Sequence, residues 1–174
     1  MPEKGKKELV INTGPIIALV AALGDLSILK SLYSRVVVPY KVCQELTVDN
    51  ASRFAVKEFQ QDSWLEKPSS PIPVTPLLKG ILDPGEAAVI QVAANESIST
   101  VCIDEPVGRR VARMSGLLVT GSLGILLRAK REGHPVSSYT PRPATERPEP
   151  LQGGSPTANY PPQAAVQSFP IRID

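Results

Sequence analysis

An α/β fold with a central, mainly parallel sheet is predicted by two observations on this 174-residue chain. Short apolar runs alternate with helical patterns of about ten residues, which is the arrangement of βαβ units. One run, residues 36–38, consists of three valines, as expected for a strand covered on both faces. The length fits one domain with a full hydrophobic core.

The first half of the chain contains two predicted strands and the helices that follow them. The turn Asn12-Thr13-Gly14-Pro15 leads from a strand into an apolar helix, with Asn12 or Thr13 as the cap. Pro39 ends the valine strand. The predicted elements are strands at residues 9–11 and 35–38 and helices at residues 16–22, 26–33, 40–46 and 51–61.

The second half opens with residues 64–78, whose four prolines predict an extended edge segment rather than a central strand. Asp83-Pro84-Gly85-Glu86 then has the residue order of a helix start, with a capping residue, proline at the first position and an acid at the third. The predicted elements are a helix from residue 84, a strand at 100–103, a helix at 105–114, a strand at 117–120 and a helix at 121–131.

The composition changes after Gly133. Residues 134–174 carry half of the 18 prolines and show no hydrophobic periodicity. Such a segment cannot bury enough apolar surface to offset the entropy lost on ordering. We therefore expect one domain over residues 1–134 and a proline-rich C-terminal tail over residues 135–174 that is flexible or irregular.

Composition excludes several classes of protein. The N-terminus does not resemble a signal peptide and no apolar run is long enough to cross a membrane, so we expect a cytoplasmic protein. A net charge of +2 neither requires nor excludes a nucleic-acid partner. Cys43 and Cys102 lie among apolar neighbours, which favours buried thiols over a disulfide or a metal site.

Acidic and amide side chains follow the predicted strands at one edge of the sheet. Asn12 follows the first strand, Asp104 and Glu105 follow the strand after the long helix, Glu86 opens that helix, and Glu45 lies on the helix after the second strand. Ligands bind at this edge of an open parallel sheet. Carboxylates crowded there repel one another unless a hard divalent cation neutralises them. Bound Mg²⁺ or Mn²⁺ can activate water against a phosphodiester, which is the chemistry of a metal-dependent nuclease.

Five motifs in a fixed order resemble those of the PIN-domain nucleases, and more narrowly those of PIN-like proteins related to VapC-type toxins. They are V-I-N-T-G-P-I-I-A-L, V-V-V-P-x-x-V-x-x-E-L, L-D-P-G-E-A-A-V-I, I-D-E-x-x-G-R-R-V-A and G-S-L-G-I-L-L-x-A-K-R-E-G. The resemblance covers residues 9–133. It implies a three-layer α/β/α fold with a central mainly parallel sheet, an Mg²⁺- or Mn²⁺-dependent endoribonuclease acting on RNA, a homodimer, and an antitoxin protein as partner.

The resemblance also implies the site residues. By position, Asn12, Glu45, Glu86 and Asp104 are the metal ligands, with Glu105 as a fifth ligand or a substitute for Asp104. Glu45, Glu86 and Asp104 are the catalytic acids among them. The family usually has Asp where this chain has Asn12, so the site loses one negative charge and should bind metal more weakly. A catalytically impaired nucleic-acid-binding or partner-binding module is therefore the alternative. A receiver-like domain fits less well, because it needs an acidic pair after the first strand.

Each acid also has a structural explanation without a metal. Glu86 stands where a capping box needs an acid, and Asp104 or Glu105 could cap the helix that begins near residue 106. Glu45 could face solvent on its helix, and Asn12 could cap the first helix.

The basic and hydroxyl candidates for nucleic-acid binding rest on weaker signals. Arg109 and Arg113 are one helical turn apart and could meet RNA phosphates, although a solvated helix face is the favoured explanation. Ser122 lies at a strand-to-helix turn whose helix N-terminus could receive a phosphate, and turn geometry alone also explains its glycine neighbours.

Overall fold

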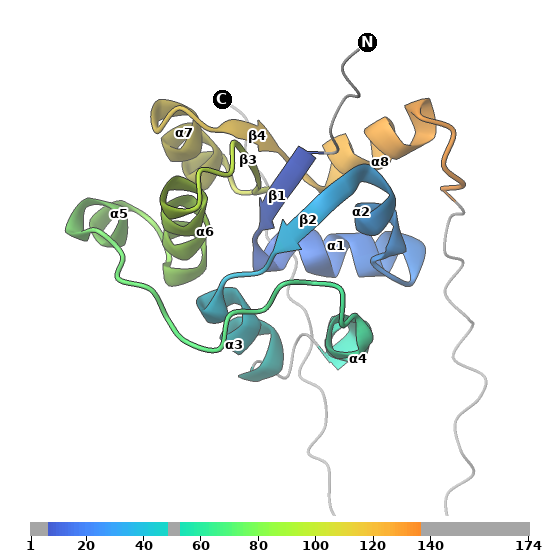
Figure 1. The fold of residues 1–174 in the computed structure, drawn as a ribbon, viewed down its shortest axis with the longest axis horizontal. Helices are drawn as coiled ribbons and strands as arrows, with labels where there is room; N and C mark the ends of the chain where they lie inside the picture. Colours follow the sequence, from blue (N-terminus) through green and yellow to red (C-terminus); the bar gives the residue numbers. More distant parts are fainter. Residues whose placement is uncertain (1–6, 49–52, 137–174) are drawn as a thin grey trace, which may run out of the picture. The chain divides into compact units, whose positions relative to one another are not determined.

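Four strands form one parallel sheet in the computed structural model, which describes residues 7–48 and 53–136 (Figure 1). The strands are β1 (Lys7–Ile11), β2 (Tyr33–Val37), β3 (Thr100–Cys102) and β4 (Leu118–Thr120). Their order across the sheet is β2-β1-β3-β4, and each neighbouring pair is parallel. The prediction of a parallel sheet built from βαβ units is confirmed.

Helices cover both faces of this sheet. Within the described part of the chain they are α1 (Thr13–Leu23), α2 (Ser27–Leu32), α3 (Tyr40–Val48), α4 (Arg53–Gln61), α5 (Pro76–Ile81), α6 (Pro84–Asn95), α7 (Pro106–Met114) and α8 (Ser122–Arg131). Figure 1 shows α6 and α7 on one face and α1, α2 and α8 on the other. The architecture is therefore the three-layer α/β/α fold that the sequence resemblance implied.

The core lies on both sides of the central strands. Leu9, Val10 and Ile11 of β1 are fully buried, as is Val101 of the neighbouring strand β3. The apolar side chains of α1 pack against the sheet and against α4, α3 and α8. Burial of each large aliphatic side chain stabilises the fold by about 1.5–3 kcal/mol. The almost wholly apolar sequence that follows β1 is thus explained by burial.

Two local predictions need correction. The second helix ends at Leu32 rather than at Tyr33, which is already the first residue of β2. Residues 64–78 are extended only in part: Glu66 exchanges backbone hydrogen bonds with the edge strand β2 and its continuation, but Pro76 begins the short helix α5. Proline is tolerated at a first helical position because the amide there has no intrahelical partner.

The strand order creates a crevice between the carboxyl ends of β1 and β3. The chain leaves β1 through α1 and α2 towards β2, and it leaves β3 through α7 in the opposite direction towards β4. Such a reversal is a topological switch point, where ligands of open α/β sheets bind. The pairing of the two strands extends to this point, because the Asn12 amide donates to the Cys102 carbonyl over 3.0 Å.

The last described helix, α8, ends at Arg131, three residues before the predicted end of the domain at residue 134. Gly133 adopts a left-handed backbone with a φ of 78°, and the His134 amide donates to the Ala129 carbonyl over 3.0 Å. Both features are typical of a helix C-terminus. From residue 137 on, the predicted tail lies outside the described residues, so its character stays a prediction.

Asp83 caps α6, and this cap can be tested. Its carboxylate accepts a hydrogen bond from the Glu86 amide over 2.8 Å. Asp83→Ala should lower the free energy of unfolding by about 0.5–2 kcal/mol because it leaves that amide without a protein partner. Asp83→Asn retains the acceptor and should lose much less. Urea unfolding of the three proteins measures the difference, and equal stability of the alanine variant and the parent would contradict the assignment.

Candidate metal centre

The turn that follows β1 carries Asn12 and Thr13, and neither side chain caps α1 in the way the sequence suggested. Asn12 occupies the N-cap position with an extended backbone, but its side chain makes no capping hydrogen bond. The residue is 4% exposed, and its Oδ1 atom is buried without a hydrogen-bond partner in the structure. An unsatisfied buried acceptor is costly. The Asn12 oxygen is therefore available to a ligand rather than used by the fold.

Glu45 reaches this turn from α3. The Thr13 hydroxyl donates to Glu45 Oε2 over 2.6 Å, which ties the carboxylate to the first residue of α1. The side chain is half-buried, so the solvent-facing role considered for it from the sequence does not describe its position. Thr13 is a residue that sequence reasoning treated only as a possible cap. Its partner Glu45 lies 32 positions away in the chain, so no local sequence pattern indicated this contact.

Gly85 allows Asn12 and Glu45 to approach α6. A Cβ atom built on Gly85 would lie 2.7 Å from Glu45 Oε2 and 3.0 Å from Asn12 Oδ1. Both distances are shorter than normal contacts, so the two oxygens occupy the space that a side chain would need. The sequence identified Gly85 only as part of a helix start. In the structure it is the position where three separate elements come together.

Glu86 is the most deeply buried acid among these residues, with 4% of its surface exposed. Its Oε1 atom has no hydrogen-bond partner in the described structure and lies against Gly108 of α7. Burial, together with the nearby charges of Asp83 and Glu105, raises the pKa of this carboxyl from 4.5 to about 7, although a backbone hydrogen bond from Asp83 opposes the shift. Glu86 therefore lies in the capped first turn of α6, and its carboxyl group at the sheet edge can be protonated near neutral pH.

Asp104 and Glu105 point to different neighbours. Asp104 Oδ1 accepts a hydrogen bond from the Ser122 amide over 2.9 Å, so this carboxylate holds the first turn of α8. Glu105 occupies the N-cap position of α7 but makes no capping bond with its side chain. Its Oε1 atom would lie 3.0 Å from a Cβ atom on Gly14, beside the turn that carries Asn12. Of the two acids, Glu105 thus faces the first turn of α1.

The three residues considered as nucleic-acid contacts, Arg109, Arg113 and Ser122, have different surroundings. Arg109 is half-buried, and its Nη1 atom donates to the Ile103 carbonyl over 2.8 Å, so the expectation that it lies on the wet face of its helix is wrong. Arg113 is exposed in the last turn of α7. Ser122 contributes its backbone amide to Asp104, and its side chain is half-buried. The two arginines are therefore not equivalent, and Arg109 fixes the end of β3.

The donor set fits a hard divalent cation in its chemistry. All the candidate side chains offer oxygen atoms, the ligands preferred by Mg²⁺ and Mn²⁺. The unpartnered Asn12 Oδ1 and Glu86 Oε1 atoms are acceptors that a cation could satisfy. Within residues 7–48 and 53–136, however, no three His, Cys, Asp or Glu side chains lie close enough together to hold a metal ion. A metal at this edge would rely on the Asn12 amide in addition to carboxylates.

Fold and sheet edge together define an α/β protein with an oxygen-lined candidate cation site at a topological switch point. A family model for the PIN domain, DUF3368, matches residues 8–142, and the chain belongs to this PIN-domain family. The family has a nuclease-like fold and is generally dependent on divalent metal ions. No curated protein matches the chain. Over the described residues, no helix has the length and apolar character needed to cross a membrane.

Gly85→Ala tests whether the close approach at α6 shapes the site. The added methyl group should displace the Glu45 carboxylate and weaken Mn²⁺ binding by about 10- to 100-fold, the usual effect of disturbing groups that orient metal ligands. Gly80→Ala on α5 is a matched control, because a Cβ atom there meets nothing within 4 Å. Calorimetric titration with Mn²⁺ measures both. Equal Mn²⁺ affinity of Gly85→Ala and Gly80→Ala would contradict the geometry.

The raised pKa of Glu86 predicts a pH dependence of stability in the presence of EDTA. A carboxyl whose pKa rises from 4.5 to about 7 on folding binds its proton more tightly in the folded state. This contribution is fully present below pH 4.5 and is lost as the pH rises through 7. The free energy of unfolding should therefore fall over this interval, and Glu86→Gln should remove that part of the fall. Urea unfolding between pH 4 and 8 measures it; parallel curves for the two proteins would refute the prediction.

Proposed function

We propose that this PIN-domain protein is a divalent-metal-dependent endoribonuclease of the VapC toxin type, which hydrolyses phosphodiester bonds in RNA. The observation that carries the proposal is the meeting of Asn12 and Glu45 around Gly85 at the switch point, with the Asn12 oxygen buried and unpartnered. Membership of a family with a nuclease-like fold supports the same reading. RNA as substrate and the toxin class come from the sequence resemblance.

Asn12, Glu45 and Glu86 are the residues that would hold Mg²⁺ or Mn²⁺, with Asp104 and Glu105 contributing from the turn between β3 and α7. The bound ion supplies positive charge that acidifies a water molecule and stabilises the charge that develops on the phosphodiester. Thr13 orients the Glu45 carboxylate through its hydroxyl. The Ser122 amide holds Asp104 beside the N-terminus of α8, where the helix dipole favours negative charge. These contacts fix the acids before the substrate arrives.

Glu86 is the acid best suited to exchange a proton. In the metal-free chain its pKa of about 7 leaves this carboxyl in both protonation states near neutral pH, so a cation that bound here would displace a proton from it. Its burial keeps bulk water away from this group. Glu45, Glu86 and Asp104 thus form the proposed catalytic set, in which Glu86 exchanges its proton for the cation.

A second candidate function is a nucleic-acid-binding or partner-binding module with an impaired metal site. Asn12 contributes no charge, and Asp104 already accepts a hydrogen bond from α8. Both features reduce the attraction of the site for a cation. In this case the fold and its surface would serve binding alone.

The homodimer and the antitoxin partner remain proposals from the VapC resemblance. A dimer through the apolar helices over residues 16–32 is not supported by the burial pattern, because the large apolar residues of α1 and α2 are mostly buried in this chain's own core. Among the described residues, exposed large apolar side chains lie instead on α7, β4 and α8 and on α3 and α5, at Val107, Met114, Leu118, Leu123, Leu127, Val48, Leu77 and Ile81.

Cleavage of RNA by the full chain in the presence of Mn²⁺ tests the proposed function. Glu86→Gln should lower the cleavage rate by about 10- to 100-fold or more, because it removes one carboxylate from the proposed metal ligands. Asp104→Asn should also abolish most cleavage, whereas Glu132→Gln on the exposed end of α8 should leave it unchanged. The cleavage rates of the parent and of each variant are measured on labelled RNA, with EDTA as the metal-free reference.

Two results separate the candidate functions. Intact RNA after incubation of folded protein with Mn²⁺ would exclude the nuclease. If Asn12→Asp then raises Mn²⁺ affinity and creates cleavage, the impaired module is the correct description of the parent chain. An Asn12→Asp variant with unchanged Mn²⁺ affinity would show that Asn12 does not contact the metal.

A further inference from the structure

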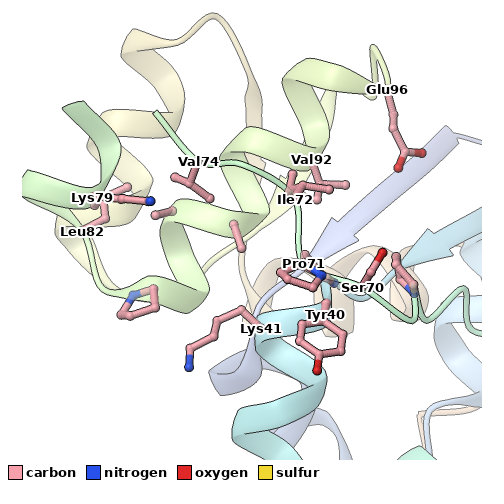
Figure 2. Close-up of a pocket in the computed structure, with 15 residues that line it drawn as sticks. Tyr40, Lys41, Ser70, Pro71, Ile72, Val74, Lys79, Leu82, Val92 and Glu96 are labelled. Carbon is pink, nitrogen blue, oxygen red and sulfur yellow. The ribbon is translucent and has the colours of Figure 1, made fainter. Parts of the chain in front are cut away.

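A groove with a cavity volume of about 490 Å³ lies beside the candidate metal centre (Figure 2). One wall is the first turn of α3, another is the extended segment around Ile72, and the floor comes from α5 and α6. Its lining is mostly apolar, and Figure 2 shows Ile72 and Val74 on the extended segment and Val92 on α6 turned towards the same space. We call this cavity the α3–α6 groove. Its size and apolar walls are those of a binding site for a small organic group.

Positive charge lies at the end of the groove where α5 and α6 meet. Lys41 and Lys79 line this part, and Glu96 lies at the opposite end (Figure 2). The Glu96 carboxylate is paired with Arg35 at 2.5 Å, and Arg35 also pairs with Glu66 and Glu8, so this end of the groove stays acidic. Neither lysine forms an ion pair or a side-chain hydrogen bond with any other described residue. Both ammonium groups are therefore available to an anionic group on a ligand.

The groove and the candidate metal centre are linked through Lys41 and Pro84. Lys41 lies one helical turn before Glu45 on α3, and residues at that spacing share a helix face. Lys41, Gln44 and Glu45 together line a shallow depression of about 300 Å³ next to the groove. On the α6 side, Pro84 lines the groove and directly precedes Gly85, where Glu45 and Asn12 converge. A chain bound at the acidic residues would therefore pass Lys41 and enter the α3–α6 groove.

Tyr40 provides an aromatic surface at the mouth of the groove. It is half-buried, and the Gln44 amide donates to its hydroxyl over 3.2 Å, which orients the ring. Aromatic side chains beside a basic track bind single-stranded nucleic acids, because each base has a flat face that can stack on a ring. An aromatic ring, an apolar cavity and two free lysines next to a hydrolytic site match a base with its flanking phosphates.

We propose that the α3–α6 groove binds one unpaired nucleotide of a single-stranded RNA, next to the phosphodiester placed at the metal centre. The base lies against Tyr40 and the apolar walls, and Lys41 and Lys79 contact phosphates. A paired base stays stacked within its duplex and cannot enter the cavity, so the substrate class is single-stranded RNA. This inference rests on the proposed nuclease function for the identity of the chain that is bound.

Binding without cleavage tests the groove separately from the chemistry. The full chain is titrated, in EDTA, into a fluorescently labelled single-stranded RNA and into a hairpin of the same composition. We expect tighter binding of the single strand. Tyr40→Ala should weaken that binding by about five- to 150-fold, the effect of removing one stacked base, whereas Tyr40→Phe keeps the ring and should bind like the parent.

Charge reversal gives a second, matched comparison. The double variant Lys41→Glu/Lys79→Glu should lower the affinity for single-stranded RNA at least tenfold and reduce its salt dependence, because two phosphate contacts are lost. Lys130→Glu, on the exposed last turn of α8, makes the same kind of change away from the groove and should have little effect. Circular dichroism confirms that each variant is folded.

The outcomes distinguish the groove from the nuclease proposal. Absence of binding to single-stranded RNA, equal binding of strand and hairpin, or equal affinities of the parent and the groove variants would each overturn the assignment of this groove, whether or not Mn²⁺ supports cleavage. Groove-dependent binding by a chain that cleaves nothing in Mn²⁺ would support the groove assignment and contradict the nuclease. A competition experiment then compares unlabelled RNA with an apolar peptide. Displacement of the labelled RNA by unlabelled RNA alone supports the proposal, and displacement by the peptide contradicts it.

Discussion

The parallel pairing of β1 with β3 is the constraint on which the candidate site depends. It places the ends of the two strands side by side, and the hydrogen bond from the Asn12 amide to the Cys102 carbonyl holds the turn after β1 against the end of β3. The chain runs in opposite directions after the two strands, which makes their carboxyl ends a topological switch point. Strands β1 and β3 are buried, and the residues that follow them lie at the edge of the sheet. This position explains why those residues are polar.

Two glycines let the candidate acids lie close to the backbone of neighbouring helices. Gly85 and Gly108 lack the side chains that would occupy the positions of Glu45 and Glu86 oxygens. The acids can therefore come near the turn after β1 although they belong to different helices. The energetic consequence appears at Glu86, whose pKa is raised by burial and by neighbouring carboxylates. A cation would relieve both the repulsion and the unsatisfied acceptors, which is why the arrangement is better explained by a ligand than by the stability of the fold.

The sequence allowed the fold and the edge to be predicted, because buried parallel strands are apolar runs and the polar residues after them must lie at their ends. Valines 36–38 and the motif that ends at Asp104 are of this kind. The sequence could not show that Glu105 faces Gly14 or that the Asp104 carboxylate accepts a hydrogen bond from the Ser122 amide. Both acids lie in one turn, and tertiary contacts decide which way each side chain points. The roles of Thr13 and Gly85 were missed for the same reason, since their partners are distant in the chain, and the contact of Arg109 with the Ile103 carbonyl depends on how the turn between them folds. Helix α5 was missed because Pro76 and the three prolines before it favoured an extended segment.

The central claim is that the oxygens of Asn12 and Glu45 form one cation site at the switch point. The most direct measurement is the anomalous scattering of a crystal of the full chain soaked in Mn²⁺. The account predicts a peak in contact with Asn12 Oδ1 and a Glu45 carboxylate oxygen, and its loss in crystals of Asn12→Ala. A well-ordered crystal with no peak at this edge, or with a peak only at residues away from Asn12, would contradict it.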